Sequence, residues 1–190
     1  MKKKDVTPYP ALFPNPVSLV TCGPLEHPNI ITIAWAATAC REPPMVSIAV
    51  TPSRHSYNLI LESGDFVVNI PFARDVFKVD LCGNLSGETV DKFAQCGYTP
   101  EPSLRVTSPR IGECPVSIEC YLEQTVHLGT HDLFIGHVAN VAIDESLLLN
   151  GKPDLSRMDT LAYAQGTYYL LGEAVGTHGF SVKEKEEEPL

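Results

Sequence analysis

Residues 116–126 read Val-Ser-Ile-Glu-Cys-Tyr-Leu-Glu-Gln-Thr-Val, and this stretch alternates apolar with polar side chains. One face carries the apolar residues Val116, Ile118, Cys120, Leu122 and Val126. The other face carries Glu119, Tyr121, Glu123 and Thr125. A period of two over so many residues predicts a long β-strand with one buried and one wetter face. Strands of that kind are typical of antiparallel sheets.

A second alternating stretch follows at residues 131–143. Its inward residues are expected to be Leu133, Ile135, Ala139, Val141 and Ile143. Residues 127–131, which include Gly129, predict the hairpin between the two strands.

Sixteen prolines and thirteen glycines divide the rest of the chain into many short segments. Further strands are expected at residues 17–22, 29–39, 45–51, 65–71 and 167–171, and the segment 29–39 reads as one strand buried on both faces. Short helices are expected at 53–61, 75–81 and 89–95, and loops at 97–112 and 144–160. The regular strand–helix alternation of a doubly wound fold is missing. The pattern therefore predicts a mainly-β fold, an antiparallel barrel with a few short helices.

The composition narrows the class of protein. The chain has 190 residues with 44% apolar side chains, which excludes intrinsic disorder. Its net charge of −9 opposes binding to phosphate backbones, so we expect no nucleic-acid partner. The longest charge-free apolar run, residues 30–39, is about half the ~20 residues that a membrane helix needs. No apolar segment follows the basic start as in a secretory signal, so a cytoplasmic protein is expected.

The six cysteines and the histidines do not predict a metal site. No Cys-x-x-Cys motif occurs, so reduced thiols are the expectation. His127 and His131 are four residues apart, but they flank a hairpin rather than share a helix face. His137 falls on the apolar face of its strand and reads as a core residue. We therefore expect no bound metal ion.

Residues 51–56, Thr-Pro-Ser-Arg-His-Ser, mark the point where a strand ends and a helix begins. The free N–H groups of a helix N-terminus attract anions, and the Arg54 guanidinium can add bidentate contacts to a phosphate. The plain alternative is that Ser53 is an ordinary N-cap and Arg54 a solvated side chain.

Two other stretches could contact a ligand. Around Trp35, the only tryptophan, the small residues Ala34 and Ala36 would let a flat ring approach the backbone, although a core strand explains them as well. Residues 80–87 combine glycines with polar groups, and Lys92 follows. That stretch could cradle a polar ligand edge, or it could be an ordinary loop beside a solvated lysine.

Familiar nucleotide and hydrolase motifs, namely GxGxxG, GxxxxGK[ST], HExxH and GxSxG, are absent. Ten segments in order, among them PNPVSLVT, HPNIITIAWAAT, SRHSYNLI, CGNLSG, DKFAQCGYT and GTHDLFIGHV, instead resemble the flavin reductase-like FMN-binding split-barrel family, in its flavoredoxin-like branch. The resemblance covers about residues 10–181. It implies one FMN-binding split-barrel domain over residues 1–182 and a homodimer with the flavin near the subunit interface. The run of charges that begins at Lys183 predicts a charged tail at 183–190.

The resemblance also assigns roles to residues. Thr32 and the backbone of residues 34–36 match the strand that lies against the flavin, and residues 53–56 match the turn that contacts the phosphate. Lys92 matches a residue on the phosphate or ribityl side. His131 matches a position near the reactive face of the flavin and is the expected catalytic residue, with Thr130 in place of the family's Asp. The full set of expected FMN-binding residues is Asn29, Thr32, Ala34, Trp35, Ala36, Thr51, Ser53, Arg54, His55, Ser56, Cys82, Gly83, Ser86 and Lys92.

Three functions are compatible with these residues. The first is an FMN-dependent oxidoreductase or electron-transfer protein, reduced by a redox partner protein or by NAD(P)H. The second is an NAD(P)H:flavin reductase that releases reduced flavin to a partner. The third is a flavin carrier without catalysis. The residues identify neither the electron donor nor the acceptor.

Overall fold

The computed structural model describes residues 1–182, and the expected charged tail at 183–190 lies outside the described residues. The prediction of a mainly-β, antiparallel fold with a few short helices is confirmed. The main sheet has the strand order β3-β2-β6-β9-β10-β5-β4. Its strands are β2 (Ser18–Cys22), β3 (Asn29–Ile33), β4 (Ala36–Cys40), β5 (Met45–Val50), β6 (Asp65–Ile70), β9 (Val116–His127) and β10 (Asp132–Ile143).

The two edges of this sheet are joined by only two residues, Ala34 and Trp35. β3 lies at one edge and β4 at the other, yet β4 begins just after β3 ends. The sheet must therefore curl until its edges meet, as in a barrel. The backbone N–H of Ala49 in β5 donates to the Trp35 carbonyl at 2.9 Å where they meet. The single strand predicted over 29–39 is thus wrong: it bends into two, and only β3 is buried.

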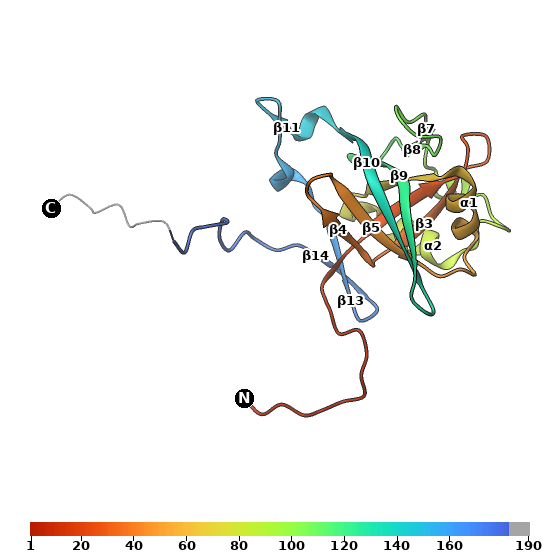
Figure 1. Ribbon diagram of the computed structural model, residues 1–190. Coiled ribbons are helices and arrows are strands. Elements are labelled where there is room, and N and C mark those ends of the chain that lie inside the picture. The colour runs from red at the N-terminus through yellow and green to blue at the C-terminus, as the bar shows by residue number, and fades with distance from the viewer. Residues whose placement is uncertain (183–190) are drawn as a thin grey trace.

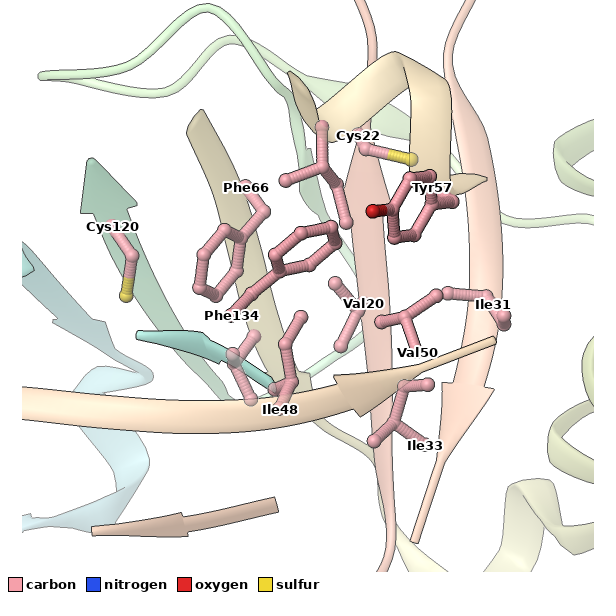
Figure 2. Close-up of a cluster of buried hydrophobic side chains, with 12 residues drawn as sticks. Val20, Cys22, Ile31, Ile33, Ile48, Val50, Tyr57, Phe66, Cys120 and Phe134 are labelled. Carbon is pink, nitrogen blue, oxygen red and sulfur yellow. The ribbon is translucent and has the colours of Figure 1, made fainter. Parts of the chain in front are cut away.

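The interior of the barrel is packed with side chains from six strands and one helix (Figure 2). Phe66 and Phe134 are fully buried there. The inward face predicted for β10 is wrong in both halves. Phe134 packs into the barrel core in place of Leu133 and Ile135, and further along Val138 packs against the core while Val141 is 48% exposed. Apolar side chains occur on both faces of this strand, so the sequence does not show which face is buried. In addition, the pairing of β10 with β9 shifts register after Ile135 and again after Val138.

Glu119 does not lie on a wetter face as predicted, because it is fully buried. Its carboxylate accepts hydrogen bonds from the backbone N–H groups of Leu104 and Arg105, at 3.0 and 2.7 Å, and from Asn140 Nδ2 at 3.1 Å. The loop predicted at 97–112 therefore covers this part of β9. The Glu119 carboxylate holds the loop in place, and its hydrogen bonds to protein groups replace those to water that burial removes. That loop carries the short strands β7 (Pro100–Glu101) and β8 (Arg110–Ile111).

The helices are α1 (His55–Ser63), α2 (Val76–Asn84) and α3 (Lys92–Cys96), with 3₁₀ turns η1 (Ala73–Asp75), η2 (Glu145–Leu147) and η3 (Leu155–Arg157). Figure 1 shows α1 and α2 beside β3. Ser53 is not the N-cap of α1: Arg54 holds that position in an extended conformation and makes no side-chain cap bond. Gly64 ends the helix as predicted, at φ 69°, where a residue without Cβ is favoured.

A second, three-stranded sheet joins β1 (Asn15–Pro16), β13 (Leu161–Ala164) and β14 (Thr167–Leu170) in the order β1-β13-β14. The strand predicted at 167–171 is confirmed, whereas β13 was missed just after the segment 144–160, which was predicted as loop. That segment also holds the hairpin of β11 (Leu148–Leu149) and β12 (Lys152–Pro153). No helix described between residues 1 and 182 is long and apolar enough to cross a lipid bilayer.

Candidate functional site

Two adjoining hollows lie where β3 and β5 end, α1 begins and α2 ends. The first has a volume of about 390 Å³ and the second about 320 Å³, sizes usual for small-molecule sites. Ile31, Thr51, Arg54 and Gly83 line both, so the hollows share a wall. The topology explains the position, since barrel closure brings the end of β3 next to β5 and the turn into α1.

The second hollow collects groups that favour an anion. Ser53, Arg54, His55 and Ser56 from the start of α1 line it, and the positive end of the α1 dipole faces the same turn. Ser56 is buried and its hydroxyl accepts a hydrogen bond from Asn29 Nδ2 at 2.7 Å. Gly87 packs against the Asn29 amide so closely that a Cβ there would collide with it. The floor of the hollow is therefore fixed by packing.

Lys92 brings a buried cation to this hollow. Its side chain is 4% exposed, and Nζ donates to the carbonyls of Ile30 at 2.7 Å and Cys82 at 2.8 Å. Burial lowers the pKa of Lys92, while the thiols of Cys82 and Cys22 oppose that shift. An ammonium has three donors, and two of them are used by these carbonyls. Lys92 was expected as a plain solvated side chain or as an anion contact, and the structure excludes the solvated alternative.

Aromatic and small side chains build the first hollow. Trp35 is 45% exposed, and its ring centroid lies 4.7 Å from that of His131. The alternative of a core tryptophan is therefore wrong. The Thr32 hydroxyl is committed to the carbonyl of Val79 in α2 at 2.5 Å. Gly83 lets α2 approach β3, because a Cβ at that position would lie 3.3 Å from Thr32 Cβ.

A buried carboxylate anchors the hairpin that carries His131. Asp132 Oδ2 accepts the Tyr57 hydroxyl at 2.6 Å and contacts His127 Nδ1 at 2.8 Å. These hydrogen bonds, that of Tyr57 first, lower the pKa of Asp132, and the same bond raises the pKa of Tyr57. Tyr57 belongs to α1, so the network ties the His131 hairpin to the helix whose start lines the second hollow.

Most of the expected site residues come together here. The second hollow is lined by Asn29, Ser53, His55, Ser56, Ser86 and Lys92, the first by Thr32, Ala34, Trp35 and His131, and both by Thr51, Arg54 and Gly83. Two expected residues do not line either hollow. Ala36 faces an outer groove, and the Cys82 sulfur lies 3.5 Å from that of Cys96 inside the core, where burial raises the pKa of Cys82 to about 12. Only the carbonyl of Cys82 reaches the site, through Lys92.

Sequence reasoning missed the far wall of the first hollow. Tyr163, Gly166 and Tyr168, from the β13–β14 hairpin, line it. Asp80 and Asn84 of α2 line the same hollow, and they belong to the stretch 80–87 that was predicted as a possible ligand contact. The signal was present in two short apolar, tyrosine-containing runs, 161–164 and 167–171, separated by Gln165 and Gly166, since two such runs around a glycine-containing turn predict a hairpin. Within residues 1–182, no group of three or more His, Cys, Asp or Glu side chains is placed to hold a metal ion.

Comparison with known proteins gives this geometry a family. The model of the flavin reductase like domain matches residues 11–172. The chain belongs to the flavin reductase-like domain family. An uncharacterized protein of Archaeoglobus fulgidus is 32% identical over 159 residues, which cover 82% of this chain and 87% of the relative.

Solved structures place the chain in the flavoredoxin-like branch of the flavin reductase-like family. Flavoredoxin of Desulfovibrio vulgaris (Miyazaki F) is 34% identical, with a TM-score of 0.87 over 95% of this chain and 99% of that one. Flavoredoxin from Methanosarcina acetivorans is 29% identical, with a TM-score of 0.85 over 95% and 100%. The resemblance to this branch and the split-barrel fold are thereby confirmed. Together with the family model, these likenesses support a flavin-binding redox protein.

Proposed function

We propose that this chain binds FMN without a covalent bond and works as an electron-transferring oxidoreductase of the flavoredoxin type. The observation that carries the proposal is the shared wall of the two hollows: an anion-binding hollow opens directly into one lined by aromatic and small side chains. A ligand that joins a flat ring system to a phosphate needs an anion-binding hollow next to a hollow that accepts the ring.

The charges in the second hollow suit a phosphate monoester. Such a group carries about −1.5 to −2 charges near neutral pH. Arg54, Lys92 and the N-terminus of α1 supply positive charge around one point, within a chain whose net charge is −9. The hydroxyls of Ser53 and Ser56 add hydrogen-bonding groups. In this proposal Arg54 binds the phosphate from the rim, while Lys92, held by two carbonyls, acts mainly through its charge.

The first hollow suits the ring system. Ala34 leaves the backbone of the bend accessible, and Trp35 with His131 offers an aromatic surface. FMN, when bound, supplies the redox chemistry, and the protein orients it and sets its electrostatic surroundings. The part of His131 in this proposal is to hold or accept a proton on its imidazole beside the ring, with Nδ1 3.0 Å from the Thr130 hydroxyl.

A binding titration tests the proposal. FMN added to the purified protein should bind in a 1:1 ratio, and Arg54→Ala should weaken binding by about 1.5–3 kcal/mol, the range for a hydrogen bond to a charged group. Arg41→Ala is the matched control, since Arg41 is exposed in the turn between β4 and β5 and lines none of the hollows. An Arg54→Ala protein that holds FMN as tightly as wild type would falsify the phosphate assignment.

The donor and the assembly are separate parts of the proposal. Electrons come either from a redox partner protein or from NAD(P)H, and an anaerobic titration with NADH and NADPH distinguishes the two. If NAD(P)H reduces a flavin that then leaves the protein during gel filtration, the protein is a flavin reductase. If no donor reduces the bound flavin, it is a carrier. A homodimer remains the expectation from the resemblance, and light scattering measures the assembly.

A further inference from the structure

The wall of the first hollow opposite α1 is a pair of tyrosines on a separate sheet. Tyr163 and Tyr168 are direct partners across β13 and β14, with ring centroids 5.3 Å apart and planes inclined by 59°. The turn between them, Gln165 and Gly166, has φ of 49° and 83°, which makes the hairpin tight. Tyr163, Gly166 and Tyr168 all line the hollow that Trp35 and His131 also line. The hollow thus has aromatic side chains from three parts of the chain.

An acidic group stands at the same wall. The Tyr168 hydroxyl donates to Asp80 Oδ1 at 3.1 Å, which joins the hairpin to α2. Burial and this hydrogen bond raise the pKa of Tyr168 to about 12, so the phenol stays protonated and remains a donor at neutral pH. Asp80 itself is exposed and lines the hollow, so its charge faces any ligand at that wall. The cation of the hollow, Arg54, lies at the boundary with the second hollow.

We propose that Tyr168 and Asp80 form a subsite for the molecule that exchanges electrons with the cofactor, and that this subsite favours flat, uncharged rings over anionic ones. The proposal rests on the proposed function. Tyr168 provides an aromatic face, and its bond to Asp80 keeps the face in place. The Asp80 carboxylate repels a carboxylate or sulfonate on the ring, because Arg54 is committed to the phosphate.

The reaction that the subsite serves balances without another reagent. With FMN bound, reduced FMN would supply a neutral quinone held at this subsite with two electrons, and the two protons would come from FMN and solvent. The quinone would leave as the hydroquinone. The two electrons come from the donor that reduced the cofactor.

Equilibrium binding tests the subsite without turnover. Benzamide and benzoate have nearly the same shape and differ in charge, and calorimetry on the FMN-loaded protein gives the Kd of each. Wild type should bind benzamide more tightly. Asp80→Asn should tighten benzoate relative to benzamide by about three- to tenfold, and about 0.5 M salt should shrink that gain. Glu62→Gln removes the same charge from an exposed position on α1 that lines none of the hollows. In this control the ratio of the benzoate Kd to the benzamide Kd should stay within twofold of the wild-type ratio.

A second pair of variants tests the aromatic face. Tyr168→Leu should weaken both ligands about two- to tenfold, as expected for the loss of an aromatic contact. Tyr169→Leu is the control, since Tyr169 is its neighbour in β14, is 52% exposed and does not line the hollow. In turnover, Asp80→Asn should raise kcat/KM for 1,2-naphthoquinone-4-sulfonate relative to 1,2-naphthoquinone by a similar factor.

The outcomes separate the two proposals. Wild-type protein that does not bind FMN overturns the proposed function and the subsite with it. Two results would overturn the subsite alone, provided that FMN binds normally. The first is that benzamide shows no saturable binding, and the second is that the ratio of the benzoate Kd to the benzamide Kd is the same in Asp80→Asn as in wild type. Loss of FMN from Asp80→Asn or Tyr168→Leu would assign these side chains to the cofactor itself and would also overturn the subsite.

Discussion

Trp35 and His131 lie with their ring centroids 4.7 Å apart and their planes inclined by 46°, although one belongs to the bend between β3 and β4 and the other to the hairpin between β9 and β10. The contact depends on barrel closure, because Trp35 sits where the two sheet edges meet and β10 pairs with β5 at that place. It brings the only tryptophan of the chain against the histidine expected to be catalytic.

Replacing His131 should separate turnover from binding. If its imidazole holds a proton for the reaction, His131→Ala should lower kcat by about 10²–10⁴-fold. The affinity for FMN should fall much less than kcat, because His131 supplies only part of the aromatic surface and the groups that bind the phosphate lie in the second hollow. Quenching of the Trp35 emission can follow FMN binding in both proteins. His27→Ala, in an exposed turn, is the control. Equal losses in affinity and kcat would reduce His131 to a packing role.

Gly136→Ala should destabilise the barrel by about 1–3 kcal/mol, the usual cost of overpacking a core. A Cβ at Gly136 would lie 2.5 Å from Phe66 Cζ and 2.9 Å from Cys120 Cβ, so at least one of them must move. Urea unfolding measures the free energy of unfolding. Gly172→Ala is the matched control, since nothing lies within 4 Å of its Cβ, and it should be neutral within 0.5 kcal/mol. A neutral Gly136→Ala would contradict the packing described for β10.

The sequence predicted the strands better than their faces or their pairing. Local patterns were sufficient for β5, β6 and β9, and Gly64 marked the end of α1. The bend at Trp35 was not visible locally, because it results from two strands pairing at opposite sheet edges. The turn at residues 51–56 was recognised as a candidate anion site because Arg54 and its neighbours are contiguous, and these residues line one hollow. Tyr163 and Tyr168 were missed because only tertiary packing brings their hairpin to the hollow.

Glu119→Ala should cost about 2–4 kcal/mol of stability, because three donors, the N–H groups of Leu104 and Arg105 and the Asn140 amide, lose their acceptor inside the protein. Glu119→Gln keeps one acceptor oxygen and should cost less. Glu123→Ala, which removes the same charge from an exposed position on β9, should stay within 0.5 kcal/mol. Chemical denaturation of the three variants measures these values. Similar losses of stability for Glu119→Ala and Glu123→Ala would contradict the buried position of Glu119 and support the solvent-facing position that the alternation predicted.

Asp132 should make the stability of the protein depend on pH in the acid range. Hydrogen bonds from Tyr57 and His127 lower its pKa in the folded protein below the ordinary 3.8. A carboxyl group of this kind contributes stability that is fully present above its unfolded pKa and is lost as the pH falls through its folded pKa. Asp132→Asn should therefore be less stable than wild type at pH 6–7, and the difference should shrink as the pH falls below about 4.

Tyr57→Phe distinguishes this carboxylate from the other acids that titrate in the same range. The Tyr57 hydroxyl is the largest cause of the shift, so its removal should bring the pKa of Asp132 back towards 3.8 and flatten part of the same pH dependence. Asp5→Asn, in the exposed N-terminal segment, is the control, and its free energy of unfolding should change with pH in the same way as that of wild type. Unfolding free energies measured between pH 3 and pH 7 decide the matter. A constant gap between wild type and Asp132→Asn over that range would mean that the carboxamide serves Tyr57 and His127 as well as the carboxylate does.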